Sequence, residues 1–586
     1  MTNPRHDAID GMKEADGMDE VDVLVVGSGG GGLVAALAAQ ARGLRTLVVE
    51  KSQYYGGSTV LSGGSIWIPN APEILRHRAA ESPDDLIAYL EAISDGTVSR
   101  ERIRAVVEQG PRMLAFLERA GPHMRFEWRP DYPDYHPAAP GGSVVGRSVE
   151  ALPFDRRELG DLDASMREPT LRTPRGMWIR SNDLHAFLGI RRSWKGKAMF
   201  LRLLARMVRA AITGARITTR GEALIGRLRL TTLDAGIPLV LETPLTQLVA
   251  DDTGRVVGAH VEQQGRTRVV KVKHGVILAS GGFDHDLPMR KQHQPVLTSD
   301  WSMGAPENTG DGIRAAGDRG AGVALLDDAW WMPAIPWGEG KLGLLLFERQ
   351  IPGQFIVNGD GRRYTNEAGP YTDFVHDMIA GENAGVTHIP SWLIIDEQSW
   401  RTNMFAGHLP LPKIPWAPVL TGRTLPTAWT ESGSVKKADS WAELADMIGV
   451  PADNLAGTVD RFNSFARQGR DLDFGRGDSA YDNYYGDPRL PNPNLREMTR
   501  GPYYAFKVIP SDLGTKGGVL TDENAQVIDV HGRPIPGLYA TGNTSAAVTG
   551  HGYSGPGGTI GPAMTFGYVA AEHIASLAAG TSPSAP

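Results

Sequence analysis

The feature that most constrains this sequence is a glycine-rich turn placed between a buried strand and a helix. Residues 21–26 read Val-Asp-Val-Leu-Val-Val, which is typical of a buried parallel strand, and Gly27, Gly29 and Gly32 follow in GxGxxG spacing. An alanine-rich stretch typical of a helix comes next. Strand, turn and helix in this order predict the first unit of a dinucleotide-binding domain.

Each position of the turn has its own physical role. We expect Gly27 to allow the tight turn, Gly29 with Ser28 to bring backbone close to a pyrophosphate, and Gly32 to let the helix pack closely on the strand. The phosphates would lie at the positive end of that helix. A second predicted strand ends in Glu50, a carboxylate placed to accept hydrogen bonds from a ribose diol.

The segment after Glu50 favours FAD over NAD. It is rich in glycine and small hydroxyl residues, and it resembles the second phosphate and isoalloxazine loop of the fumarate reductase/succinate dehydrogenase flavoprotein family. Bare backbone of this kind can lie flat along the pyrophosphate, the ribityl chain and the ring. The resemblance implies that FAD is bound here by Lys51, Gly57, Ser58, Ser62, Gly63 and Gly64.

Three later pieces predict that this domain is split by an insertion. A strand at 276–280 ends in glycines, residues 537–543 resemble the strand by which the chain returns, and a helix opens near 557–562 with a proline in its first turn. That helix N-terminus would stabilise negative charge on a reduced flavin. The contacts that the resemblance implies are Gly282, Gly542, Asn543, Thr559 and Ile560; at 543 many flavoproteins carry an acid.

These pieces predict an α/β fold in which a Rossmann-type FAD-binding domain is interrupted by an α+β substrate-capping catalytic domain. The expected bounds are 1–20 for a disordered lead-in, 21–283 and 510–580 for the two parts of the FAD-binding domain, 284–509 for the catalytic domain, and about 177–230 for a basic helical insertion. Within the catalytic domain, Asn-Gly-Asp-Gly at 358–361 predicts a hairpin, followed by the Arg-Tyr-Thr-Asn-Glu motif at 363–367.

The absence of cysteine limits the redox chemistry. It excludes disulfides, thiolate-bound iron–sulfur clusters, a cysteine nucleophile and a cysteinyl link to the flavin, so FAD is expected to be noncovalent. We expect no metal site. The net charge of −7 disfavours a general nucleic-acid binder. No run of ~20 apolar residues, the length that spans a bilayer, is present, so the cytoplasm is the expected compartment.

The remaining motifs resemble the 3-ketosteroid Δ1-dehydrogenases. Fumarate reductases should carry an arginine and histidines that clamp two carboxylates, whereas this chain reads Ala-Gly-Pro-Tyr at 368–371 and His-Gly-Tyr-Ser-Gly-Pro-Gly at 551–557. Tyr-Pro-Asp-Tyr at 132–135 is a third shared motif. The resemblance runs from about 21 to 574 and is broken mainly between 170 and 228.

The resemblance implies a role for each residue in the 1,2-desaturation of a 3-ketosteroid. The Tyr553 hydroxyl and the Gly557 N–H hold the C3 carbonyl, Tyr371 accepts the C2 proton, and FAD receives the C1 hydride. A donor pair of this kind forms an oxyanion hole, in which losing one donor typically costs about 100- to 1000-fold in rate. A third tyrosine supports the base, and we favour Tyr135 over Tyr132.

Two other interpretations stay open at this point. One is a related enzyme, such as a 3-ketosteroid Δ4-(5α)-dehydrogenase or a fumarate-type reductase. The other is a non-catalytic flavin-binding partner. The sequence does not indicate the electron acceptor.

Residues 191–220 depart from the family pattern because they carry nine lysines and arginines and no acid. In a helix here, Phe200, Leu204, Met207, Val208 and Ala211 are expected on one face and Arg202, Arg206 and Arg209 away from it. This is the pattern of a helix that rests on anionic lipid, and peripheral membrane contact is the hypothesis. A packed helix with a solvated arginine face is the alternative.

Overall fold

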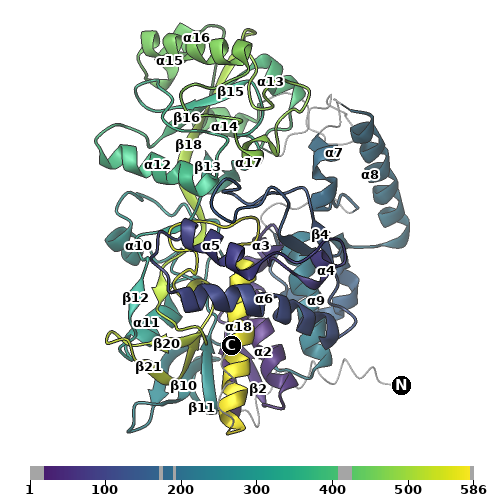
Figure 1. Cartoon of the computed structure of the whole chain (residues 1–586), viewed down its shortest axis with the longest axis vertical. Helices are drawn as coiled ribbons and strands as arrows, with labels where there is room; N and C mark the ends of the chain where they lie inside the picture. The colour runs from purple at the N-terminus through teal and green to yellow at the C-terminus, as the bar shows by residue number, and fades with distance from the viewer. Residues whose placement is uncertain (1–18, 170–175, 189–192, 339, 407–424, 581–586) are drawn as a thin grey trace.

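The computed structural model describes residues 19–169, 176–188, 193–338, 340–406 and 425–580. Figure 1 shows two bodies stacked along the long axis, with the first and last helices of the nucleotide domain in the lower body and the later part of the inserted segment, from β13 on, in the upper one. The predicted α/β class is confirmed. The expected lead-in, 1–20, lies almost wholly outside the described residues.

The lower body is built on a mainly parallel sheet whose strands come from both ends of the chain. Its centre is β1 (Glu20–Val26), with β11 (Arg266–Leu278) on one side and β2 (Thr46–Val49) on the other. Beyond β11 lies β21 (Pro534–Ala540), and beyond β2 lies β8 (Leu239–Val240), each parallel to its neighbour. The carboxyl ends of β1, β11 and β21 therefore meet at one edge, where α/β sheets bind ligands.

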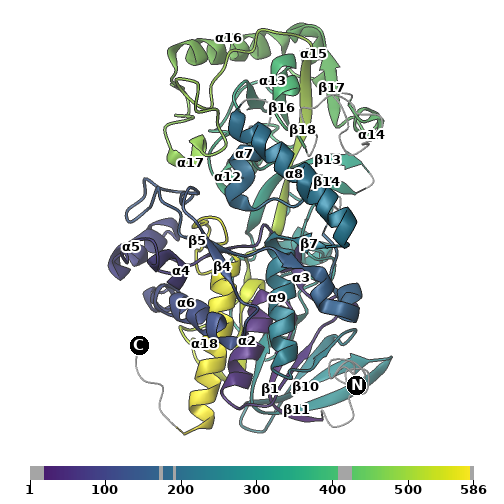
Figure 2. The same cartoon turned by 90° about the vertical axis from the view of Figure 1, so that its right-hand side faces the viewer.

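Two glycine contacts hold the helices of this body unusually close. Helices α2 (Gly30–Ala41) and α18 (Ile560–Ala578) lie side by side (Figures 1 and 2). A Cβ added to Gly31 would lie 2.8 Å from the Ala563 carbonyl oxygen, and one added to Gly567 would lie 2.3 Å from the Gly31 oxygen. Both positions therefore require glycine.

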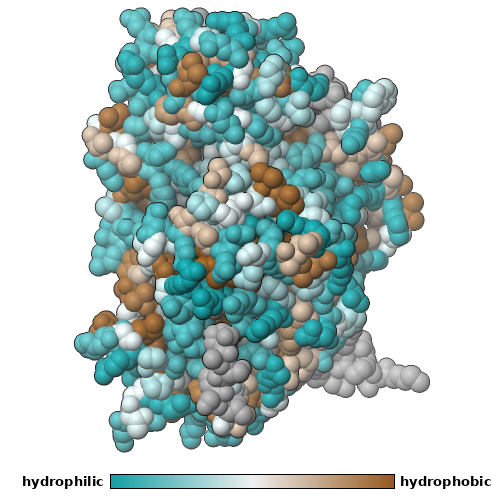
Figure 3. Space-filling view, in the orientation of Figure 1, coloured by the Kyte–Doolittle hydropathy of each residue, from teal (hydrophilic) through white to brown (hydrophobic). Residues whose placement is uncertain are grey.

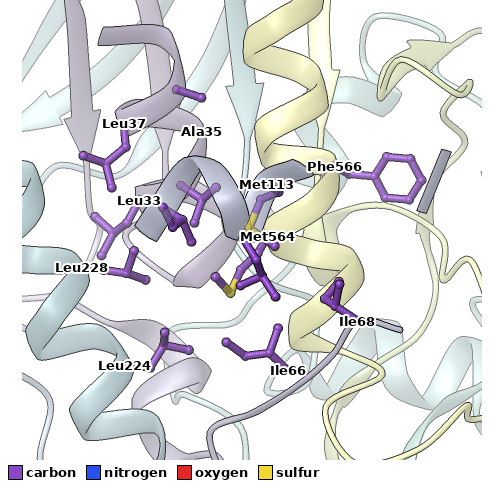
Figure 4. Packing of buried hydrophobic residues seen from close by; sticks show 14 of the residues in the cluster. Leu33, Ala35, Leu37, Ile66, Ile68, Met113, Leu224, Leu228, Met564 and Phe566 are labelled. Carbon is purple, nitrogen blue, oxygen red and sulfur yellow. The ribbon is translucent and has the colours of Figure 1, made fainter. Parts of the chain in front are cut away.

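A continuous apolar core surrounds these two helices. Leu33 of α2, Met564 of α18, Met113 of α6 (Arg100–Ala120) and Leu228 of α9 (Arg220–Asp234) are all fully buried together (Figure 4). Because α2 is apolar on every side, it is covered on every side. This packing fixes where its N-terminus points.

The upper body contains an antiparallel sheet with the order β14-β13-β18-β16-β15, and β17 also pairs with β18. Its strands are β13 (Ala329–Gly338), β14 (Lys341–Leu344), β15 (Gln354–Val357), β16 (Ser391–Asp396), β17 (Val435–Ala438) and β18 (Tyr503–Thr515). The helices α12 (Tyr371–Asn383), α15 (Trp441–Ile448) and α16 (Ala452–Gln468) belong to this body. The expected domain boundary at 509/510 falls inside β18, whose second half pairs with β13 as far as Thr515.

The hairpin predicted at 358–361 is wrong. The turn forms, with the Gly361 N–H donating to the Asn358 carbonyl (3.0 Å), but β15 pairs with β16 and not with the residues after the turn. Those residues are held by buried charges instead: the Arg363 guanidinium binds both Glu367 and Asp471. Because buried ions must be paired, this network and not a strand ladder fixes the segment before residue 368.

The basic helix is present as α8 (Trp194–Thr213), but the prediction of which face it buries is partly wrong. Met199, Leu203 and Ala210 are the apolar residues that it buries, whereas Leu204 and Val208 are exposed. The predicted face was offset because α8 packs against α7 (Leu184–Leu188) and the chain before it, not against the sheet. Arg191 and Arg192 lie outside the described residues. Within the described ranges, no helix has the length and apolar character needed to cross a bilayer.

Candidate functional site

The first glycine turn lies at the edge where the parallel strands end. Gly27 has a φ of +109°, and an added Cβ would lie 2.2 Å from the Ala279 carbonyl oxygen. At Gly32 an added Cβ would lie 2.1 Å from the Gly27 oxygen. At Gly29, in contrast, it would contact only Thr59 Oγ1, at 3.6 Å. Gly27 and Gly32 therefore shape the turn, while Gly29 leaves backbone open for a ligand.

Glu50 lies directly beside this turn. Its Oε2 accepts hydrogen bonds from the N–H (3.0 Å) and the hydroxyl (2.6 Å) of Ser28, and its Oε1 accepts one from the Ser52 N–H (3.0 Å). The carboxylate predicted to bind a ribose diol thus also organises the turn. It lies at the carboxyl end of β2, as the sequence predicted.

The second glycine segment connects the turn to residues 305–311. The Ser58 hydroxyl accepts hydrogen bonds from the Ala305 N–H (2.9 Å) and the Asn308 amide (3.0 Å). The Lys51 ammonium bonds Thr309 and pairs with Asp311 (2.8 Å). Both side chains, predicted as FAD contacts, are thus directed toward the segment that enters the inserted domain.

The end of this segment leaves backbone exposed. Ser62 donates to the Thr59 carbonyl (2.6 Å) and accepts from the Gly64 N–H (3.0 Å). Gly64 has a φ of +73°, and Gly57, with a φ of +51°, opens the short helix α3 (Gly57–Leu61). A Cβ at Gly63 would meet nothing within 4 Å. Gly63 therefore presents bare backbone, whereas Gly64 is packed against Arg220, whose carbonyl carbon a Cβ would approach to 2.2 Å.

The predicted flavin contacts from the end of the chain surround a cavity of about 320 Å³, including space open to solvent. Gly542, Asn543 and Thr559 line it, together with Trp330 and Arg102. The Trp330 indole N–H donates to Asn543 Oδ1 (3.0 Å). Ile560 begins α18 at the cavity, whereas Gly282 packs away from it, where a Cβ would lie 2.0 Å from Thr515 Oγ1.

These residues fit FAD. The N-termini of α2 and α18, which favour anionic groups, come to the same edge because the two helices pack in contact. Gly29 and Gly542 beside them leave room that a Cβ would fill, and among the described residues no carboxylate lines the cavity. Gly29 and the start of α2 suit the pyrophosphate, and Asn543 with the start of α18 suits the ring.

Beside this cavity, three predicted tyrosines lie in mutual contact. The Tyr135 and Tyr371 hydroxyls are 3.1 Å apart, and the Tyr553 hydroxyl lies 3.0 Å from Thr559 Oγ1. The three rings pack edge to face, with centroids 5.0–5.5 Å apart. Three distant parts of the chain therefore bring their hydroxyls to one point.

Local structure fixes each of these tyrosines. Tyr371 is the first residue of α12 and follows Pro370, which has no N–H to leave unpaired at the helix start. Tyr553 lies in the turn before α18. Tyr132 stacks instead on Tyr484, with ring centroids 4.0 Å apart. Of the two tyrosines considered from the sequence, Tyr135 is the one that bonds Tyr371.

Burial dominates the electrostatics of this cluster. It raises the pKa of Tyr371 and of Tyr135 well above the ordinary value for a phenol. It also raises the pKa of Tyr553, although the hydrogen bond between Tyr553 and Thr559 opposes that rise. All three hydroxyls are therefore protonated at neutral pH, and a proton acceptor among them needs a compensating positive field.

Gly557 has a backbone that only glycine tolerates. Its φ is +92°, and an added Cβ would lie 2.3 Å from the Ser65 carbonyl oxygen. The Gly557 carbonyl accepts a hydrogen bond from the Trp67 N–H (3.2 Å). Within the described residues its own N–H has no hydrogen-bond acceptor, so this amide is available to a ligand.

Sequence reasoning missed part of the cluster. Tyr481 and Tyr485 are buried in it, and Tyr481 packs on Tyr135 with ring centroids 4.8 Å apart. Trp330 is buried there too, with its ring centroid 4.9 Å from that of Tyr553. Three of the chain's 15 tyrosines fall within residues 481–485, and this local density was the signal that could have drawn attention to them.

Known proteins resemble the chain over almost its whole length. The model of the FAD binding domain family matches residues 22–560. The 3-oxosteroid 1-dehydrogenase of Mycolicibacterium smegmatis is 44% identical, covering 96% of this chain and 98% of that protein. The 4-oxocyclohexanecarboxylate 2-dehydrogenase of Sinomonas cyclohexanicum is 34% identical, covering 95% and 93%. The crystal structure of 3-ketosteroid Δ1-dehydrogenase from Sterolibacterium denitrificans, in complex with 1,4-androstadiene-3,17-dione, has a TM-score of 0.86 and 37% identity, and covers 95% and 100%.

The purified protein should be yellow and hold about one noncovalent FAD per chain, released intact by acid precipitation. Gly32→Ala should lose FAD and stability, because the new Cβ meets backbone that cannot move aside. Gly457→Ala is the matched control, since nothing lies within 4 Å of that Cβ and alanine favours helices. Flavin absorbance measures the bound FAD, and thermal unfolding measures the stability. Retention of FAD by Gly32→Ala, or release of FMN from the wild type, would contradict this assignment.

Proposed function

Because the chain belongs to the FAD binding domain family, and within it to the 3-ketosteroid Δ1-dehydrogenases, we propose that it is an FAD-dependent oxidoreductase that introduces the 1,2 double bond of 3-ketosteroids. The 44% identity over 96% of the chain carries this conclusion. The tyrosine cluster beside the flavin cavity supports it independently, since dehydrogenation beside a ketone needs groups that bind an oxygen and move a proton.

The substrate oxygen is held by two donors in this proposal. The Tyr553 hydroxyl and the Gly557 N–H flank the turn before α18, and the Gly557 amide has no acceptor among the described residues. Two such donors stabilise negative charge that develops on the C3 oxygen when the C2–H bond breaks. Their contribution is larger in a buried site, where water does not screen it.

The C2 proton goes to Tyr371, and its partner is Tyr135. The 3.1 Å contact between the two hydroxyls supports this pairing, because a second phenol can donate to the oxygen that accepts the proton and can pass a proton on. When bound, FAD supplies the acceptor for the C1 hydride. Removal of one proton and one hydride leaves the C1–C2 double bond.

Anaerobic mixing with steroids tests the proposed reaction. A 3-keto-4-ene steroid should bleach the flavin, and the product should carry the 1,2 double bond by mass spectrometry and ultraviolet absorbance. Bleaching only by a 5α-saturated 3-ketone, with a 4-ene product, would instead indicate a Δ4-(5α)-dehydrogenase. A flavin that no ketone bleaches would leave the non-catalytic binding role.

Replacing Tyr371 by Phe should abolish turnover and leave steroid affinity within about tenfold, because the lost hydroxyl acts on a proton and does not hold the ligand. Tyr553→Phe should weaken both turnover and affinity. Tyr132→Phe is the matched control: its ring stays stacked on Tyr484 and turnover should persist. Flavin reduction and steroid titration give the two quantities. Substantial turnover by Tyr371→Phe would mean that another residue accepts the C2 proton.

We further propose that α8 brings the protein to an anionic membrane surface. Trp194, Leu201, Val208 and Ile212 are 82%, 65%, 60% and 79% exposed, and apolar side chains gather along the outer edge of α8 in Figure 3. The helix contains no acid, and Lys195, Lys197, Arg202 and Arg209 are exposed around these residues. Exposed apolar side chains among cations suit anionic lipid.

The position of α8 supports the same proposal. Figure 2 shows α7 and α8 beside the junction of the two bodies. Leu184 and Leu188 of α7 pack against the tyrosine cluster, and His185 lies 4.4 Å from the Tyr484 ring. A surface that rests on lipid here would be next to the substrate site, which shortens the path of a sparingly soluble steroid.

Vesicle cosedimentation tests this surface. The protein should bind anionic but not neutral vesicles, and salt should weaken binding, since each cation near the surface contributes about 1 kcal/mol before screening. Changing Arg202 and Arg209 to Glu should abolish binding. Arg206 is not suitable for this test because it donates to the Trp178 carbonyl and stacks on that ring. Vesicle binding that neither salt nor the two substitutions weakened would favour the packed-helix alternative.

A further inference from the structure

A buried arginine lines the cavity assigned to the flavin ring. Arg102 is 6% exposed, and it borders this cavity together with Asn543 and Thr559. Among the described residues no ion pair includes Arg102, and its Nε has no hydrogen-bond acceptor there. Because an uncompensated cation is costly to bury, its place at a ligand cavity indicates that the ligand uses the charge.

The surrounding elements hold this guanidinium in place. Arg102 lies in the first turn of α6, where Ser99 caps the helix and its hydroxyl accepts the Arg102 N–H (3.3 Å). The Arg102 Nη2 donates to the Ala546 carbonyl (3.0 Å), and Cζ lies 5.3 Å from the centroid of the Phe566 ring on α18. The charge is thus fixed between α18 and the loop that contains Ala546, and both of these line the cavity.

A second source of positive charge comes to the same cavity. Thr559 is the N-cap residue of α18, and the first N–H groups of a helix carry partial positive charge. Among the described residues that line the cavity, Arg102 is the only charged one. Water screens such charges little in a buried site, so both of them favour an anion there.

One carboxylate acts on Arg102 from a distance. Burial lowers the pKa of Arg102 to about 10, and the Asp522 charge opposes that fall. Asp522 forms no ion pair with Arg102: its Oδ1 accepts hydrogen bonds from the N–H groups of Asn524 (2.9 Å) and Gln526 (2.8 Å), and it does not line the cavity. Arg102 is therefore a cation at neutral pH, and its charge acts on the cavity without a paired anion.

We propose that Arg102 stabilises the negative charge that the flavin ring takes up on reduction, and so makes bound FAD a stronger hydride acceptor. A hydride brings two electrons and one proton, so its arrival leaves one negative charge on a neutral ring, while Arg102 keeps its own protons. The inference rests on the FAD-dependent part of the proposed function, the assignment of the ring to this cavity, and not on the steroid.

The midpoint potential of bound FAD tests this role, measured on the holoenzyme by photochemical reduction against redox dyes without steroid. Arg102→Met replaces the cation by an apolar chain and should lower the equilibrium constant for two-electron reduction about tenfold, which is a fall of ~30 mV. Sulfite adds to oxidised flavin and also leaves an anion on the ring, so its affinity should fall as well. Arg102→Lys retains a cation and should change both quantities less.

Two further variants separate the charge from other effects. Arg104→Met is the matched control, because Arg104 lies two residues along α6, is exposed and does not line the cavity. It changes the net charge equally and should leave the potential and the sulfite affinity unchanged. Arg102→Gln is uncharged, but its amide can still donate to the Ala546 carbonyl. It should lower the potential as Arg102→Met does, and it gives the measurement if Arg102→Met does not retain FAD.

The results distinguish this inference from the proposed reaction. A potential that does not fall in Arg102→Gln, or that falls equally in Arg104→Met, overturns the inference, and the proposed reaction stands if the steroid still bleaches the wild-type flavin. If the potential falls as expected but no 3-keto-4-ene steroid bleaches the wild-type flavin, the inference stands and the proposed reaction fails. A protein that binds no FAD removes both.

Discussion

Helices α2 and α18 contact one another at a distance that only glycine permits, and the site depends on this contact. Gly31 and Gly567 let the two backbones approach until a Cβ would overlap a carbonyl oxygen. The approach brings together two helix N-termini that are more than 500 residues apart in the chain. One suits a pyrophosphate and the other a reduced ring, so a single packing contact sets the spacing of the two helix ends that face these groups.

The chemistry is built around this frame from loops and helix starts. Tyr553 and Gly557 belong to the turn that leads into α18, so they are fixed relative to the flavin cavity. Tyr371 comes from the inserted domain, at the start of a helix whose preceding carbonyls are held by Arg349 and Gln350. The proposed oxyanion donors and the proposed base thus come from different bodies, and their alignment depends on how these bodies are joined.

The sequence predicted the nucleotide fold well because its signals are local. A strand followed by GxGxxG and an apolar helix is one contiguous pattern, and the structure has it with ends shifted by only a few residues.

The predicted hairpin at 358–361 failed because a turn signal does not reveal its strand partner; buried pairing of Arg363 with Glu367 and Asp471 decided that region. The prediction of the buried face of α8 failed for a similar reason. Periodicity gives an apolar side, but tertiary contacts decide which side is covered. Tyr481 was not found because the three tyrosines within residues 481–485 match no motif of the predicted site, although their density was a signal.

Strand β18 has a mechanical consequence for how a steroid reaches the cluster. It runs without interruption from the upper sheet to Thr515 beside the nucleotide edge, paired with β13 across the junction. Because the two strands are paired with each other here, swinging one body away from the other has to bend this ribbon, and each backbone hydrogen bond lost in doing so would cost about 0.5–1.5 kcal/mol net. A hinge motion that admits a steroid must therefore bend β13 and β18 together.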